Sequence, residues 1–89
     1  MSEHSLDDLS TFVTVAREGN FTRAAAKLGV SPSAVSQTMR NLEERIGLRL
    51  LTRTTRSVTR TEAGENLLQE IAPLLDQLQL NLTAIAELG

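Results

Sequence analysis

Hydrophobic positions in the first sixty residues predict three helices followed by a two-stranded hairpin. The first apolar stripe consists of Leu6, Leu9, Phe12, Val13 and Ala16. Its members recur at three- and four-residue spacing, which is typical of an amphipathic helix, and Gly19-Asn20 marks the end of that helix. Residues 48–60 are rich in Thr, Val and Arg, a composition that favours two short strands joined by a turn.

Residues 21–28 predict a second, short helix. Residues 24–26 are three consecutive alanines, the strongest helix formers, and Leu28 supplies an apolar anchor. Thr22 is expected to cap the N-terminus of this helix through its side-chain oxygen. Gly29 is expected to end the helix, because glycine adopts the left-handed backbone conformation without steric cost.

A third helix begins almost at once, after a very tight turn. Ser31 is the expected cap of this helix and Pro32 occupies its first helical position. Two helices joined so closely predict a helix-turn-helix. The small Ala25 is expected where the two helices cross, and Val30 is expected to close the turn from the core side.

The third helix has two contrasting faces. One carries the apolar stripe Val35, Met39, Leu42 and Ile46. The opposite face carries Ser33, Ser36, Gln37, Arg40 and Glu44. An ordinary solvated face is one interpretation, but the tight turn and the flanking arginines favour a face that enters the major groove of DNA. There Gln can bond adenine, Arg can bond guanine and Ser can bond either base.

Residues 61–89 predict one long final helix. Thr61 is the expected cap, and Glu62 and Glu65 have the charge that a helix N-terminus favours. Steps of three and four residues, as in a coiled-coil seam, connect Leu68, Ile71, Leu75, Leu78, Leu82 and Ile85. Part of this stripe can pack on the domain itself. Beyond Pro73, which is expected to bend the helix rather than end it, a partner helix is the better cover.

Composition narrows the function. The 89 residues predict one domain, and the absence of cysteine excludes disulfides and a cysteine-based zinc site. The net charge is −2, yet residues 17–60 contain all nine basic residues and only three acids, a net of +6. Residues 1–16 and 61–89 carry −3 and −5. A local basic block of this kind neutralises phosphates.

The ends and the hairpin complete the residue-based picture. The acidic start MSEHSLDD resembles no secretory signal, and no apolar run approaches the ~20 residues of a membrane span, so a soluble, reducing compartment such as the cytoplasm is expected. Arg53 and Arg56 bracket Thr54-Thr55, and a short turn with such arginines can enter a narrow minor groove. A solvated basic loop without a partner is the alternative.

Phe12 and Phe21, the only aromatics, are expected in the core, which disfavours single-strand binding by base stacking.

The run FTRAAAKLGVSPSAVSQTMRNLEERIGLRLLTRTTRSVTRTEAG resembles the DNA-binding domain of LysR-type transcriptional regulators, and the resemblance extends from about Leu6 to Leu88. It implies a mainly α winged helix-turn-helix over residues 1–60, with three helices and a two-stranded wing. Residues 61–89 would be a linker helix that pairs antiparallel in a homodimer, and a tetramer is left open for a full-length regulator. In the family an effector-binding domain follows and would hold any small-molecule effector; whether the chain is a fragment of a longer bacterial regulator is left open.

The same resemblance implies the roles of individual residues. Contacts from the helix-turn-helix to double-stranded DNA are expected from Ser31, Pro32, Ser33, Ser36, Gln37 and Arg40. The wing contacts are expected from Arg53 and Arg56. Thr22 is expected to bind a phosphate at a helix N-terminus.

Three classes of function compete on this sequence: a dimeric DNA-binding module, a purely structural dimerisation module and an enzyme. For an enzyme, the only histidine, His4, lies in the tail, no serine has an evident base, and Glu43 and Glu44 point to different sides of a helix. A structural module leaves the basic block without a purpose. We therefore predict sequence-specific DNA binding, with no catalytic residue, no cofactor, no metal and no membrane partner.

Overall fold

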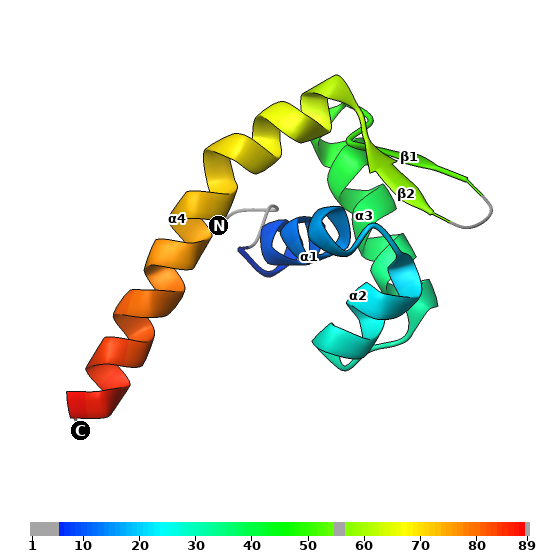
Figure 1. Cartoon of the computed structure of the whole chain (residues 1–89). Helices are drawn as coiled ribbons and strands as arrows, with labels where there is room; N and C mark the ends of the chain where they lie inside the picture. Colours follow the sequence, from blue (N-terminus) through cyan, green and yellow to red (C-terminus); the bar gives the residue numbers. More distant parts are fainter. Residues whose placement is uncertain (1–5, 55–56, 89) are drawn as a thin grey trace.

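The computed structural model describes residues 6–54 and 57–88. In chain order, its elements are α1 (Leu6–Glu18), α2 (Phe21–Leu28), α3 (Pro32–Ile46), β1 (Leu51–Arg53), β2 (Val58–Arg60) and α4 (Glu62–Leu88). Figure 1 shows α1, α2 and α3 gathered together, the hairpin extending from them, and α4 running away from the rest. The predicted mainly α winged helix-turn-helix with a long final helix is thereby confirmed.

The core lies where α1 meets its neighbours. Helix α1 contacts α2, α3, α4 and β2, and it buries Phe12, Val13, Val15 and Ala16. Leu6, predicted as part of the apolar stripe, is exposed because it lies in the first turn at the free end of α1, whereas Val15 is fully buried outside that stripe. The buried arc of α1 is wider than its sequence pattern because protein surrounds the helix on several sides.

At the turn of the helix-turn-helix, α2 ends and α3 begins at the predicted residues. Gly29 has φ 73°, in the left-handed region, and its N–H donates to the carbonyl of Ala25. The Oγ of Ser31 accepts a hydrogen bond from the N–H of Ala34 at 3.1 Å, and Pro32 opens α3. Ala25 is 2% exposed, consistent with the small residue predicted at the helix crossing.

Two local predictions around α2 are wrong. The N-cap is Asn20, whose Oδ1 accepts from the N–H of Arg23 at 2.9 Å, and Thr22 lies inside the helix. The chain already turns at Gly19, which has φ 68°, so the capping position comes two residues earlier than predicted. Val30 is 49% exposed rather than facing the core, and it lines a surface hollow with Leu28, Ala34 and Val35.

Most of the predicted apolar stripe of α3 faces inward. Val35, Met39 and Leu42 are each almost completely buried. Ile46 is exposed instead, because it is the last residue of α3, where the helix extends past the core. The stripe is therefore one turn shorter than its sequence pattern.

The hairpin and the start of α4 are joined by hydrogen bonds. Strands β1 and β2 are antiparallel, with Leu51 opposite Arg60 and Arg53 opposite Val58. The hydroxyl of Thr61 donates to the carbonyl of Arg49 at 2.6 Å and accepts from the N–H of Gly64 at 3.0 Å, which confirms Thr61 as the cap of α4. A Cβ at position 64 would collide with the backbone carbonyl that directly precedes β1, so this position requires glycine.

Helix α4 changes its surroundings along its length. Its N-terminal half packs against α1 and buries Leu68 and Ala72, and its distal half extends beyond the domain (Figure 1). Pro73 lies on the exposed side and the helix continues past it, as predicted. Large exposed apolar side chains follow at Leu74, Leu78, Leu80, Leu82, Ile85 and Leu88. Among the residues described, no helix is long and apolar enough to cross a membrane.

Candidate nucleic-acid interface

The outer face of α3 is the polar surface that the sequence predicts. Ser33, Gln37 and Arg40 are exposed and Ser36 is half-buried, whereas the residues of the apolar stripe between them face the core. Glu44, one turn beyond Arg40, is exposed as well. The separation follows from the helical repeat of 3.6 residues, which puts the two sets on opposite sides.

Hydrogen bonds organise the polar side chains of α3 into one row. The two terminal nitrogens of Arg40 donate to Ser36 Oγ at 3.0 Å and to Gln37 Oε1 at 3.1 Å. The amide nitrogen of Gln37 donates to Asn41 Oδ1 at 3.0 Å. These pairs have the spacing of three and four residues at which helix side chains meet.

Most hydrogen-bond donors and acceptors of this row remain free to bind a ligand. Gln37 uses one of two amide hydrogens and one of two oxygen lone pairs, so it retains the donor and the acceptor that an adenine edge requires. Arg40 uses two of its five N–H donors. The sequence analysis did not select Asn41, although the four-residue spacing from Gln37 would have revealed it.

The N-termini of α2 and α3 carry further residues that were predicted to contact DNA. Ser31, Pro32 and Ser33 lie exposed at the N-terminus of α3, where free N–H groups and the helix dipole favour anions. Thr22 is exposed in the first turn of α2. Its position as a phosphate contact stays a prediction, although its role as the cap belongs to Asn20.

The wing places its two predicted arginines differently. Arg53 turns inward: its guanidinium carbon lies 5.3 Å from the centroid of the Phe21 ring, and its side chain is only 24% exposed. Arg56 lies outside the described residues. Beside it, the N–H of Ser57 donates to the Oγ1 of Thr54 at 3.0 Å. The antiparallel hairpin is as predicted, but a minor-groove contact by Arg53 would require its side chain to leave this position.

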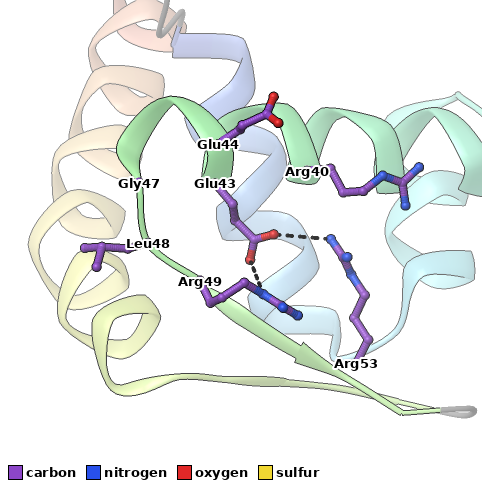
Figure 2. Close-up of a pocket in the computed structure, with 7 residues that line it drawn as sticks. All are labelled: Arg40, Glu43, Glu44, Gly47, Leu48, Arg49 and Arg53. Carbon is purple, nitrogen blue, oxygen red and sulfur yellow. Dashed lines mark ion pairs between the residues drawn. The ribbon is translucent and has the colours of Figure 1, made fainter.

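Glu43 explains the inward position of Arg53, although no role was predicted for Glu43 from the sequence. The residue is 7% exposed, and its Oε2 accepts hydrogen bonds from the backbone N–H groups of Leu50 and Leu51 at 2.8 and 3.0 Å. Its Oε1 lies 3.5 Å from Nη2 of Arg53, and Arg49 Nε lies 4.0 Å from Oε2 (Figure 2). This one carboxylate joins α3 to the strand that begins the wing.

Ion pairs neutralise several arginines of the basic block, residues 17–60. Arg17, Arg45 and Arg60 pair with Asp76, Asp8 and Glu65, acids that lie outside residues 17–60. These exposed pairs cancel charge at the periphery of the domain. In the part of the chain that the structure describes, Arg23 and Arg40 form no ion pair with a carboxylate. The described arginines that lack a carboxylate partner therefore lie on the helix-turn-helix.

Known proteins share both the sequence and the shape of this chain. Residues 6–65 match the family model described as the bacterial regulatory helix-turn-helix protein of the lysR family. The HTH-type transcriptional regulator PgrR of Escherichia coli (strain K12) is 51% identical over 88 residues, which cover 99% of this chain and 29% of PgrR. The chain thus spans less than a third of the length of this relative.

Solved structures of related proteins have the same fold as this chain. The crystal structure of the BenM DBD in complex with benA site 1 DNA superimposes with a TM-score of 0.83 at 33% identity, covering 96% of both chains. The full-length Vibrio cholerae virulence activator AphB gives a TM-score of 0.88 at 33% identity, covering 94% of this chain and 29% of AphB. The chain belongs to the lysR family of bacterial regulatory helix-turn-helix proteins.

Proposed function

We propose that the chain is the sequence-specific DNA-binding module of a cytoplasmic bacterial transcription regulator. Helix α3 enters the major groove of a duplex and the wing lies at the adjacent minor groove. The observation that carries the proposal is the outward polar row of α3 above a buried apolar stripe. The DNA complex of the similar BenM domain supports the same partner.

Within this proposal the contacts have distinct tasks. Gln37, Arg40 and Ser36 reach base edges and read sequence, because their free donors and acceptors suit the major groove. Thr22 and the exposed start of α3 hold phosphates and fix the register of the protein on the duplex. Arg56 and Arg53 serve the wing at the minor groove, where narrow tracts attract arginine.

The test compares Gln37→Ala with the wild-type protein on two duplexes. One duplex is selected from a random library by the wild-type protein, and the other is unrelated in sequence. Fluorescence anisotropy should show a loss of about 1–3 kcal/mol on the selected duplex and a much smaller loss on the unrelated one. Gln79→Ala, an exposed glutamine of α4, is the matched control and should bind both duplexes like the wild type. Equal losses on both duplexes would contradict base reading by Gln37.

The distal half of α4 supports pairing with a second copy of the chain. Leu78, Leu82 and Ile85 lie on one side of the helix at steps of four and three, and all are exposed. An antiparallel helix from a second copy would cover them. Leu82→Glu should therefore give monomers in sedimentation velocity, whereas Leu80→Glu on the opposite side should not. A persistent Leu82→Glu dimer would show that this seam is not the interface.

The exposed seam also favours a second candidate, a structural dimerisation module that binds no DNA. The two candidates respond differently to salt. Affinity for a duplex falls steeply as salt rises, with a log–log slope set by the number of neutralised phosphates. Pairing through leucines lacks that dependence. A salt titration of wild-type binding to the selected duplex separates them.

A further inference from the structure

A hollow of about 490 Å³ lies between the C-terminal half of α3 and the start of the wing. Three arginines and two glutamates contribute to its lining: Arg40, Arg49, Arg53, Glu43 and Glu44. In Figure 2, Arg40 projects from α3, Arg49 lies just before β1 and Arg53 lies on β1; the guanidinium groups of Arg49 and Arg53 lie beside Glu43, and that of Arg40 points away from it along α3. The two nearby carboxylates decide how much of this positive charge remains available.

The carboxylate of Glu43 is engaged mainly within the domain. It is buried, it accepts two backbone N–H groups through Oε2, and its Oε1 faces Arg53 at 3.5 Å. Arg53 is held further by the Phe21 ring. Glu43 and Arg53 therefore cancel each other inside the domain. Glu44 contributes to the lining as well, and Figure 2 shows its carboxylate on the side of α3 opposite to Arg49 and Arg53.

Arg40 and Arg49 supply the remaining positive charge of the hollow. The Arg49 side chain is 69% exposed, and its nearest carboxylate contact is the 4.0 Å approach of Nε to a Glu43 oxygen that two backbone donors already occupy. Arg40 bonds only the uncharged side chains of Ser36 and Gln37. Guanidinium forks facing one hollow match the shape and charge of a phosphate group.

We propose that this hollow seats one backbone phosphodiester of the bound duplex, with Arg49 as the principal donor and Arg40 on the opposite wall. The proposal rests on the proposed function. If α3 lies in a major groove and the wing lies in the neighbouring minor groove, one sugar-phosphate strand separates the two grooves. That strand must pass between α3 and β1, where the hollow lies. Arg49 thereby joins the interface as a residue that positions the protein without reading sequence.

The first test is the salt dependence of Arg49→Gln. Losing one phosphate contact should lower the log–log slope by about one on selected and unrelated duplexes alike. The affinity gap between variant and wild type should therefore narrow about threefold as salt rises from about 50 to 200 mM. Arg60→Gln is the matched control: Arg60 is on β2, pairs with Glu65 at 3.2 Å and does not line the hollow. Its slope should stay that of the wild type.

The second test locates the phosphate. In the selected duplex, single phosphates are replaced in turn by uncharged methylphosphonates. We expect wild-type affinity to drop at one phosphate between the two contacted grooves, and we expect Arg49→Gln to be insensitive to replacement at that phosphate. Thermal unfolding of Arg49→Gln should match the wild type, which shows that the variant is folded.

The outcomes separate the two proposals. If Arg49→Gln keeps the wild-type slope and responds to every methylphosphonate as the wild type does, the hollow binds no phosphodiester. Should Gln37→Ala still lose base preference in that case, the proposed function stands without the hollow. A wild-type protein that binds no duplex at all would overturn both.

Discussion

Replacing Glu43 with Gln removes one buried negative charge while keeping the size and shape of the side chain. In the wild type, the Oε2 of Glu43 accepts the N–H groups of Leu50 and Leu51, and Oε1 faces Arg53. A Gln can still accept one or two of these bonds through its single oxygen. Its amide nitrogen, however, is a donor and would then face the Arg53 guanidinium, which cannot accept.

The expected cost follows from these contacts. Hydrogen bonds to a charged group contribute about 1.5–3 kcal/mol each. Breaking a buried ion pair by removing one partner costs about 3–5 kcal/mol, because the other charge is left without compensation. We expect Glu43→Gln to lower the free energy of unfolding by about 3–5 kcal/mol. A domain of this length has about 4–13 kcal/mol in total, so this one carboxylate holds a large part of it.

Urea denaturation followed by circular dichroism measures this loss, at one fixed protein concentration because the chain is expected to pair with itself. In a thermal scan the midpoint should fall by about 12 °C or more. Glu44→Gln is the matched control. It removes the same charge from the neighbouring residue of α3, but Glu44 is exposed, so its effect should stay within about 0.5 kcal/mol.

A double-mutant cycle with Arg53→Met tests the mechanism. If Glu43→Gln destabilises the domain because it leaves the charge of Arg53 without a partner, adding Arg53→Met should restore part of the lost free energy of unfolding. The effects of the two substitutions should then not add. Simple additivity would show that the charges are independent. Equal stability of Glu43→Gln and Glu44→Gln would refute the whole reasoning, because the buried carboxylate would then stabilise nothing.

Three further predictions follow from single contacts. Asn20→Ala should cost about 1 kcal/mol in the free energy of unfolding and Thr22→Ala much less, as measured by urea denaturation, because Asn20 is the residue that caps α2. Gly64→Ala should destabilise the domain by about 1–3 kcal/mol despite the better helix propensity of alanine, since a Cβ there meets the carbonyl before β1; a neutral or stabilising result would contradict that packing. The hydrogen bond from Arg17 lowers the pKa of Asp76, so its stabilising effect is present above the ordinary pKa of a carboxyl group and is lost as pH falls through the lowered value. Asp76→Asn should remove that part of the acid dependence, which stability curves at neutral and acidic pH would show.

The local signals in the sequence predict the helices well, because each is set by residues close together. Ser31-Pro32 and Thr61 begin helices where capping chemistry requires, and Gly29 ends one. The stripe containing Val35 faces the core because its spacing matches the helical repeat. Such features need no knowledge of the remaining chain.

The residues whose roles were predicted wrongly depend on contacts that the helical pattern alone does not identify. Asn20 and Thr22 are both good caps, and only the turn at Gly19 decides between them. Val30 is apolar but half exposed, since it lies at the edge of a surface hollow rather than in the core. Arg53 looks like a wing-tip residue in sequence, yet a carboxylate ten positions earlier draws it inward.

The same carboxylate connects folding to recognition. Glu43 projects from α3 and holds the backbone where β1 begins, so it fixes the wing relative to the polar row that includes Gln37. A protein that reads a major and a minor groove together needs that relation to match the spacing of the grooves. An acid buried within a basic surface opposes phosphate binding by its charge. Glu43 pairs with Arg53, however, and the proposed phosphate site then relies on Arg49 and Arg40. In the proposed complex, the placement of the wing relative to α3 would therefore depend on Glu43, a buried residue outside the polar row.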